Sequence, residues 1–454
     1  MISPANNFSF EQCQQARLSR DPRFDGKIFI GVKSTGIFCR PTCPAKLPKE
    51  ENVEYFADKT LALNAGYRPC LRCRPDSLIN SWAWKGVETT FVRAVKMIDD
   101  GALQQRTLEQ VSELLGVSDR YLRKLFTRYL GMSPKQYDLY SKLLFAKQLL
   151  QSSQLSITDI AFASGFNSTR RFNDAFHKAM QLTPTEVRGN KVTQPSQTLF
   201  LPYQGKLNWQ HMLDFYRLRA IQGIETISEQ SYSRSVVVNE KLAWFSATPD
   251  FKGNKIKLEL EVDDATQIKP LINSVRRMFD LDANTTVIET HLNTIAPGIV
   301  KQTGLRIPGV WSAWEAGVRA IVGQQVSVKA AISQLNRLVA AMNEGNTSIC
   351  FPTPQAMRNS DYAFLKMPQS RKDTLQRFAA FYDENPDNDP SEWLAIKGIG
   401  PWTVNYAQLR GQSLPDRLLD TDLIVKKARQ DFPSLTVDNV SPWGSYATFH
   451  LWNQ

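Results

Sequence analysis

The most regular feature of the chain is a repeated pattern of apolar residues. Segments 107–134 and 157–184 each carry apolar residues at helical spacing on both sides of a glycine. Leu108, Val111, Gly116 and Val117 recur 49 positions later as Ile157, Ile160, Gly165 and Phe166, and Leu122, Phe126 and Pro134 recur 50 positions later as Phe172, Phe176 and Pro184. Each copy predicts two helices joined by a tight turn. We expect the second helices at about 118–128 and 168–178, with Ser118 and Asn167 at their capping positions.

The pattern changes after residue 200. Residues 235–238 are an apolar run and residues 256–262 alternate apolar with charged side chains, and both patterns predict strands. Residues 269–280 form an amphipathic pattern typical of a helix. These elements indicate a small α+β lobe over 200–296, followed by a helical region. The polar segment 189–199, which contains Pro and Ser, is expected to be a linker.

A chain of 454 residues is too long for one ordinary domain. The fold class we expect is multidomain α+β. It consists of a small cysteine domain (1–80), an all-α tandem helix-turn-helix domain (81–188), the linker, the α+β lobe (200–296) and an all-α domain (297–454). No stretch approaches the roughly 20 apolar residues of a membrane span, and residues 1–10 do not have the pattern of a secretory leader. We therefore expect a cytoplasmic protein with no membrane partner.

Positive charge is concentrated in the first half of the chain. The net charge is +11, and residues 1–200 contain 28 Lys/Arg against 18 Asp/Glu, while residues 201–454 contain 27 against 26. This distribution predicts that the N-terminal half contacts the phosphates of double-stranded DNA. The near-neutral second half can also bind DNA if its charges are separated by face.

Four of the six cysteines form two close pairs. Cys39 and Cys43 are followed, after 26 residues, by Cys70 and Cys73. Two short pairs separated by a loop suit one tetrahedral zinc ion held by four thiolates. The spacing alone leaves open whether the zinc only stabilises a small domain or also activates a cysteine.

The residues around these cysteines carry a family resemblance. Segments 35–43 (TGIFCRPTC) and 66–73 (GYRPCLRC) resemble the N-terminal domain of the Ada adaptive-response proteins over about residues 8–76. The resemblance implies that Cys39 is the nucleophile that accepts a methyl group from a DNA phosphotriester. Zinc would keep its sulfur deprotonated. The nearby Arg40, Arg68, Arg72 and Arg74 are either phosphate contacts or solvated surface charges.

The duplicated helix-turn-helix resembles the AraC-type DNA-binding domain, including the tails 131–134 (GMSP) and 182–184 (LTP). The resemblance implies that each second helix enters a major groove of promoter DNA, and it makes RNA polymerase a possible partner. The basic residues on these helices are Arg120, Arg123, Lys124, Arg128, Arg170, Arg171 and Lys178. The alternative is a helical protein-interaction module.

Segment 394–404 (LAIKGIGPWTV) resembles the helix-hairpin-helix. In this motif Gly398 and Gly400 would allow a tight turn and a close approach of the backbone to DNA. Asp422 follows Trp402 by 20 residues, the distance at which the helix-hairpin-helix glycosylase superfamily places its acid. The resemblance also suggests a monovalent cation at the hairpin.

Blocks such as 317–327 (GVRAIVGQQVS), 350–355 (CFPTPQ) and 442–447 (PWGSYA) extend the resemblance over 199–454 to AlkA, the 3-methyladenine DNA glycosylase II family. By that match Asp422 is the catalytic carboxylate and Trp402, Tyr406 and Trp452 line the pocket of the flipped base. Their alternative roles are a helix cap for the acid and core packing for the aromatic residues.

The same match places Gln325 as the wedge that fills the gap left in the DNA, although the family has leucine there. Trp402 and Thr403 follow the hairpin where bifunctional relatives carry a lysine, so we expect a monofunctional glycosylase. The expected protein is a monomer that repairs alkylated DNA and regulates transcription. The alternative is a transcription factor whose C-terminal half senses alkylation without catalysis.

Overall fold

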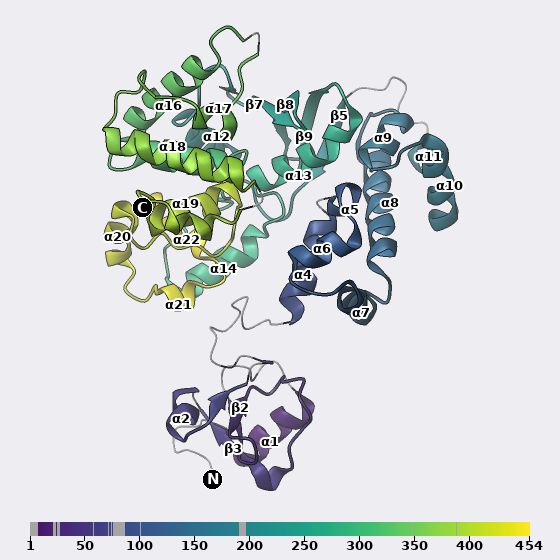
Figure 1. Ribbon diagram of the computed structural model, residues 1–454, viewed down its shortest axis with the longest axis vertical. Coiled ribbons are helices and arrows are strands. Elements are labelled where there is room, and N and C mark those ends of the chain that lie inside the picture. The colour runs from purple at the N-terminus through teal and green to yellow at the C-terminus, as the bar shows by residue number, and fades with distance from the viewer. Residues whose placement is uncertain are drawn as a thin grey trace. The chain divides into compact units, whose positions relative to one another are not determined.

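The computed structural model describes residues 8–20, 24, 28–57, 59–70, 72–73, 75, 87–99, 101–189, 197–346, 348–386 and 388–454 (Figure 1). The chain forms two compact units, Met1–Leu139 and Tyr140–Gln454, and the boundary falls within helix α8 (Pro134–Ser152). Among the described helices, none is both long and apolar enough to cross a membrane.

The N-terminal part is a four-stranded sheet in the order β3 (Val53–Phe56), β1 (Phe29–Val32), β2 (Ile37–Cys39) and β4 (Arg68–Pro69), accompanied by helices α1 (Phe10–Ser19) and α2 (Lys59–Asn64). Side chains alternate across β1, because successive residues of a strand point to opposite faces. Ile30 therefore packs with Cys13 and Tyr55, while Phe29 packs with Phe38 and Phe56. The sheet has a small core on each face.

The tandem helix-turn-helix is confirmed. The first copy contains α6 (Leu108–Leu114) and α7 (Asp119–Leu130), preceded by α4 (Val87–Asp99) and α5 (Ala102–Gln105). Helix α8 leads to the second copy, α9 (Ile157–Ala163) and α10 (Thr169–Met180), which α11 (Pro184–Arg188) follows. Both turn glycines have a positive φ, 68° at Gly116 and 81° at Gly165, a conformation that favours glycine.

One capping residue differs from the prediction. Ser118 caps α7 by accepting a hydrogen bond from the Tyr121 N–H, as expected. In the second copy the cap is Ser168, which accepts from the Arg171 N–H, and Asn167 lies outside the helix. The extra residue of the second copy lies between its turn glycine and its cap, so the capping position moves by one.

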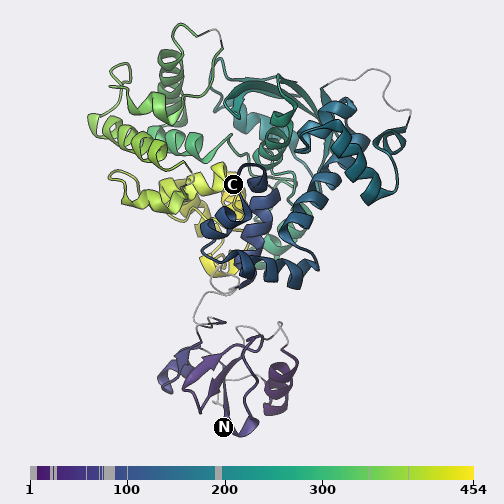
Figure 2. The same cartoon turned by 45° about the vertical axis from the view of Figure 1, so that its right-hand side comes forward.

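The lobe after residue 197 contains a five-stranded antiparallel sheet (Figure 2). Its order is β5 (Thr198–Pro202), β9 (Lys255–Val262), β8 (Lys241–Asp250), β7 (Tyr232–Val238) and β6 (Glu225–Ile227). Helices α12 (Trp209–Arg217) and α13 (Ile268–Met278) share a core with its inward residues. The expected linker 189–199 ends too late, because Thr198 and Leu199 already belong to β5 and Leu199 is buried. Residues 190–196 lie outside the described part.

The C-terminal region is helical and has two cores. The first gathers α15 (Ala313–Gly323), α16 (Val328–Met342), α17 (Pro354–Arg358), α18 (Gln369–Glu384) and the 3-10 helix η5 (Pro390–Ala395). The second gathers α14 (Thr285–Ile295), α20 (Leu423–Ala428), α21 (Val437–Val440) and α22 (Gly444–Trp452). Helix α19 (Pro401–Gly411) contributes to both, so it connects the two halves of the domain.

A buried ionic network joins the α+β lobe to the helical region. The Arg234 guanidinium lies 2.9 Å from the Glu315 carboxylate, and Arg319 lies 2.7 Å from Glu225. Burial opposes ionisation of Glu225, but Arg319 and Arg234 outweigh it and lower the pKa of that carboxyl to about 2. The charges of two acids and two arginines thus neutralise one another in a region where all four side chains are buried from water.

Candidate functional site

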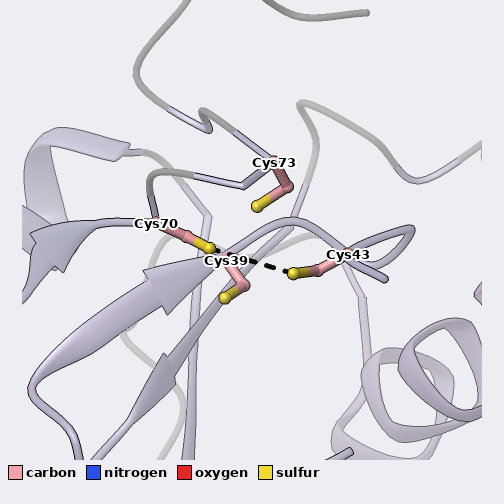
Figure 3. A group of neighbouring side chains, drawn as sticks. All are labelled: Cys39, Cys43, Cys70 and Cys73. Atoms are coloured by element: carbon pink, nitrogen blue, oxygen red, sulfur yellow. Dashed lines mark hydrogen bonds between the residues drawn. The ribbon is translucent and has the colours of Figure 1, made fainter. Parts of the chain in front are cut away.

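The pairing of two short strands brings the cysteines together. Strand β2 ends at Cys39 and β4 leads directly into Cys70, and the two strands pair in parallel with Phe38 opposite Pro69. The Cys70 N–H donates to the Phe38 carbonyl at 3.0 Å, and the Cys43 N–H donates to the Arg40 carbonyl at 3.1 Å. The four sulfur atoms therefore converge from both segments (Figure 3).

The sulfur geometry fits zinc. All four sulfurs lie within 4.8 Å of one another, and those of Cys43 and Cys70 are 3.9 Å apart. A tetrahedron with Zn–S bonds of about 2.3 Å has edges of roughly 3.8 Å. Four sulfurs at these distances can share one divalent metal ion, and the chain has a Zn²⁺ site.

The four ligands differ in exposure. Cys73 is 1% exposed and Cys43 and Cys70 are each 7% exposed, while Cys39 is only half-buried. Arg68 and Arg72, which lie near the cysteines in the sequence, are exposed, and Arg40 is half-buried. Arg74 lies outside the described residues. Cys39 is thus the least buried of the four residues, with basic side chains close to it along the chain.

The two recognition helices present basic faces. On α7, Arg120, Arg123 and Lys124 are exposed, whereas Leu122 and Phe126 are fully buried. On α10, Arg170 and Arg171 are exposed, whereas Phe172 and Phe176 are fully buried. This separation follows from the helical spacing of the apolar residues. The predicted DNA-binding side chains are therefore available to solvent in both repeats.

The structure around the two hairpin glycines differs, and the difference decides whether another residue could replace each of them. Gly398 has a φ of +98°, and a Cβ atom there would lie 2.1 Å from Thr374 Oγ1. Gly400 is extended, with a φ of −114°, and a Cβ there would meet nothing within 4 Å. The internal packing therefore requires glycine only at position 398. Gly400 is the N-cap of α19 and offers no side chain to the first N–H groups of that helix.

The predicted wedge lies beside the hairpin. Gln325 is exposed and has a φ of +55°, in the loop between α15 and α16. The preceding residue, Gln324, donates from Nε2 to the Gly398 carbonyl at 3.1 Å and to Thr403 Oγ1 at 3.3 Å. One side chain thus connects the wedge loop to the hairpin.

Asp422 caps a helix and at the same time contacts a predicted pocket residue. Its Oδ1 accepts hydrogen bonds from the N–H groups of Ile424 at 3.0 Å and Val425 at 3.2 Å, and from Trp452 Nε1 at 3.2 Å. No donor among the described residues reaches Oδ2. The carboxylate is half-buried. Three donors thus fix the orientation of the carboxylate through Oδ1.

The neighbouring acid Asp416 has a structural role. Its two oxygens accept hydrogen bonds from the Ser441 hydroxyl at 2.7 Å and from the Gly444 N–H at 3.2 Å. These contacts hold the start of α22 against the loop before Asp422. Both oxygens of Asp416 are therefore engaged in contacts that position α22.

A chain of contacts leads from Trp452, which donates to the acid, through Phe215 and Arg410 to the other predicted pocket residues. Trp402 and Tyr406 stack with centroids 5.2 Å apart on α19, and Trp452 stacks on Phe215 with centroids 6.4 Å apart. Arg410 donates to the Tyr406 hydroxyl at 2.8 Å, and its guanidinium lies 4.8 Å from the centre of the Phe215 ring. Burial raises the pKa of Tyr406, but Arg410 and Arg219 outweigh it and lower that pKa.

Phe215 was missed by sequence reasoning. It lies on α12, about 190 positions before Tyr406, and only the fold brings it to this aromatic group. The Arg219 guanidinium also lies over this ring, 3.7 Å from its centre. The amphipathic pattern of α12 marks Phe215 only as a residue near the core.

Comparisons with known proteins agree with the domain order. Family models match residues 12–76 (metal binding domain of Ada), 111–190 (helix-turn-helix domain) and 198–312 (AlkA N-terminal domain). A probable bifunctional transcriptional activator/DNA repair enzyme AlkA of Mycobacterium tuberculosis is 30% identical over 98% of this chain and 96% of its own length. The chain belongs to this family of bifunctional enzymes.

Two further relatives each match one part of this bifunctional family member. DNA-3-methyladenine glycosylase 2 of Escherichia coli is 32% identical over 56% of the chain and 95% of its own length. The bifunctional transcriptional activator/DNA repair enzyme AdaA of Bacillus subtilis is 31% identical over 38% of the chain and 80% of its own length. The fusion of an Ada-type zinc and helix-turn-helix part with an AlkA-type glycosylase is confirmed, and the chain is a DNA-binding protein.

Proposed function

We propose that the C-terminal half excises alkylated purines such as 3-methyladenine from DNA after the base has been flipped out. The observation that carries this proposal is the Asp422–Trp452 contact, which places an oriented carboxylate beside an aromatic group. An N-alkylated purine is cationic, so its face is attracted to the electron-rich rings of Trp402, Tyr406 and Trp452.

The carboxylate supplies the chemistry. As the glycosidic bond breaks, its electron pair moves to the base nitrogen and positive charge develops on the sugar. Asp422 Oδ2 stabilises this charge and accepts a proton from the water that adds to C1′. The products are the free base and an abasic site in an intact strand. Because Trp402 and Thr403 follow the hairpin in place of a lysine, no Schiff base forms and the strand is not cut.

Product analysis tests this assignment. The full chain should release free 3-methyladenine from methylated duplex DNA, detected by chromatography. The treated strand should break only after alkali. Strand cleavage without alkali would contradict the monofunctional mechanism, and absence of free base would favour the alternative of a non-catalytic sensor.

For the N-terminal domain, we propose that Cys39 accepts a methyl group from a DNA phosphotriester. The thiolate attacks the methyl carbon, the C–O bond breaks, and its electron pair leaves an ordinary phosphodiester. The support is the exposure of Cys39 relative to its three buried partners. Bound zinc would keep the four sulfurs as thiolates. Cys43, Cys70 and Cys73 would hold the ion while Cys39 reacts.

Methylation would also change the charge of the site. Four thiolates on one Zn²⁺ carry a net charge of −2, and methylating one reduces it to −1, which lowers the repulsion of DNA. Intact mass should increase by one methyl group after exposure to DNA containing methyl phosphotriesters. The Cys39→Ser variant should not gain this mass. A methyl group on any other cysteine would refute the assignment.

The remaining assignments rest on the family resemblance. We propose that Arg120, Arg123, Lys124, Arg170 and Arg171 contact promoter DNA, that the bound activator recruits RNA polymerase, and that Gln325 fills the gap left by the flipped base. A monovalent cation at the hairpin stays a prediction. The domain limits 1–80, 81–188 and 297–454, a monomeric state and a cytoplasmic, nucleoid-associated location are also proposed; the α+β lobe starts at Thr198, not at 200. Footprinting on promoter DNA with and without Cys39 methylation tests the regulatory part.

A further inference from the structure

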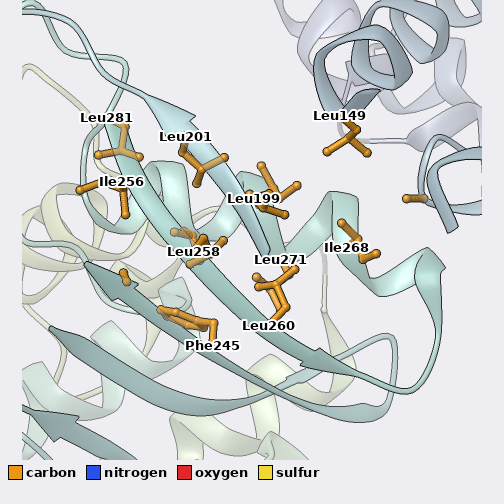
Figure 4. Close-up of a cluster of buried hydrophobic side chains, with 14 of the residues drawn as sticks. Leu149, Leu199, Leu201, Phe245, Ile256, Leu258, Leu260, Ile268, Leu271 and Leu281 are labelled. Atoms are coloured by element: carbon orange, nitrogen blue, oxygen red, sulfur yellow. The ribbon is translucent and has the colours of Figure 1, made fainter. Parts of the chain in front are cut away.

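The second helix-turn-helix repeat and the glycosylase lobe share one hydrophobic core. Buried residues of α8 and α9 belong to the same cluster as residues of the five-stranded sheet and α13. In Figure 4, Leu149 of α8 lies close to Leu199 of β5 and Ile268 of α13. Leu149, Leu199 and Ile268 are each at most 2% exposed. Because protein interiors are close-packed and resist deformation, a shared core of this kind should hold the second repeat and the glycosylase lobe together.

Backbone and charged contacts strengthen the connection. The Gln154 N–H donates to the Thr198 carbonyl at 2.9 Å, and Ser153 forms a β-bridge with Leu199. The Lys269 ammonium lies 5.7 Å from the centre of the Phe145 ring. The end of α8 therefore adds main-chain pairing to the edge of the glycosylase sheet at β5. Helix α10 is held by the same core, through Phe172 and Phe176.

The second helix-turn-helix repeat adds positive charge to a catalytic part that is nearly neutral. The catalytic part, residues 201–454, has 27 Lys/Arg and 26 Asp/Glu, a net charge of only +1. Residues 140–189 add six Lys/Arg and three Asp/Glu, a net charge of +3. Arg170, Arg171 and Lys178 on α10 are exposed. Affinity for the phosphate backbone depends on such cations.

We propose that the second helix-turn-helix repeat serves the glycosylase as a DNA-holding arm, so that Arg170 and Arg171 contribute to substrate binding during base excision. The inference rests on the proposed glycosylase function. It gives α10 a second role besides promoter recognition, because the helix is built into the catalytic unit, whereas α7 belongs to the other compact unit.

The test compares two charge-matched double variants of the full chain. Arg170→Gln/Arg171→Gln removes two cations from α10, and Lys147→Gln/Lys252→Gln removes two exposed cations from α8 and from the β8–β9 turn. All four positions are exposed, so both variants should fold, which circular dichroism checks. Excision of 3-methyladenine from methylated duplex is measured over a range of salt concentrations.

The α10 variant should raise KM about tenfold at low salt, leave kcat unchanged, and reduce the slope of log affinity against log salt by about 2. The control should retain the wild-type KM. An unchanged KM in the α10 variant, or an equal rise in both variants, would overturn the inference while leaving the glycosylase assignment intact. Failure of the wild type to excise would instead refute the proposed function, and the inference with it.

Discussion

The two hairpin glycines should fail in different ways when replaced by alanine. In Gly398→Ala the new Cβ would lie 2.1 Å from Thr374 Oγ1, at a φ of +98°. The left-handed conformation costs alanine about 1–2 kcal/mol, and overpacking adds about 1–3 kcal/mol. We therefore expect the free energy of unfolding to fall by about 2–5 kcal/mol.

Gly400→Ala should leave folding nearly unchanged. Its φ of −114° is accessible to alanine and its Cβ has open space. Losing a good N-cap residue lowers the free energy of unfolding, and restricting the unfolded chain raises it. The net change should be within about 1 kcal/mol. In the complex, however, the added methyl would stand where we expect the hairpin backbone to meet a phosphate. We expect the Kd for duplex DNA with an abasic site to rise about tenfold.

Urea denaturation gives the stability of both variants, and fluorescence anisotropy gives the DNA affinity. Thr374→Ala in the Gly398→Ala background should recover part of the lost stability, because the remaining contact with the residue 374 Cβ is longer, at 3.1 Å. A Gly400→Ala variant that binds DNA as the wild type does would refute the hairpin as the contact. An unchanged stability in Gly398→Ala would refute the geometry described for the turn.

Three further predictions concern the acid, the buried ions and the metal. Trp452→Phe removes the N–H that donates to Asp422 Oδ1. The single-turnover excision rate should therefore fall about tenfold while DNA affinity is retained. An unchanged rate would show that this donor does not orient the acid. Arg319→Met leaves the two buried acids Glu225 and Glu315 with Arg234 as their one remaining buried cation among the described residues. Urea denaturation should show a loss of about 3–5 kcal/mol, against less than about 1 kcal/mol for the half-exposed Arg358→Met. A strong chelator should release one zinc ion per chain, measured colorimetrically, and abolish methyl transfer without affecting base excision; loss of both activities would contradict independent sites.

Local patterns predicted the parts of the structure that depend on neighbouring residues. The close spacing within each cysteine pair predicted one shared metal site, although the pairing of β2 with β4 is what brings the two pairs together. Both helix-turn-helix copies follow from their apolar spacing. The change of cap from Asn167 to Ser168 shows the limit of such patterns. Both residues are good caps, and the choice depended on where the inserted residue was accommodated.

Contacts between distant segments could not be predicted in this way. Phe215 reaches Trp452, the ring that contacts Asp422, only through the packing of α12 against the helical domain. The core that joins the second repeat to the glycosylase sheet depends on Leu149, Leu199 and Ile268 meeting across more than 100 positions. Each of these side chains looks like an ordinary core residue in its own segment. The expected linker obscured the connection, because its polar composition indicated two independent parts.

The central claim is that Asp422 is the carboxylate of a DNA glycosylase. Single-turnover release of 3-methyladenine should be measured for the wild type, Asp422→Asn and the neighbouring Asp420→Asn. We expect Asp422→Asn to retain the fold and the helix cap, because asparagine also accepts hydrogen bonds at that position, but to lose base release by at least about 100-fold. Asp420→Asn should excise at nearly the wild-type rate. Comparable release by Asp422→Asn and the wild type would contradict the account.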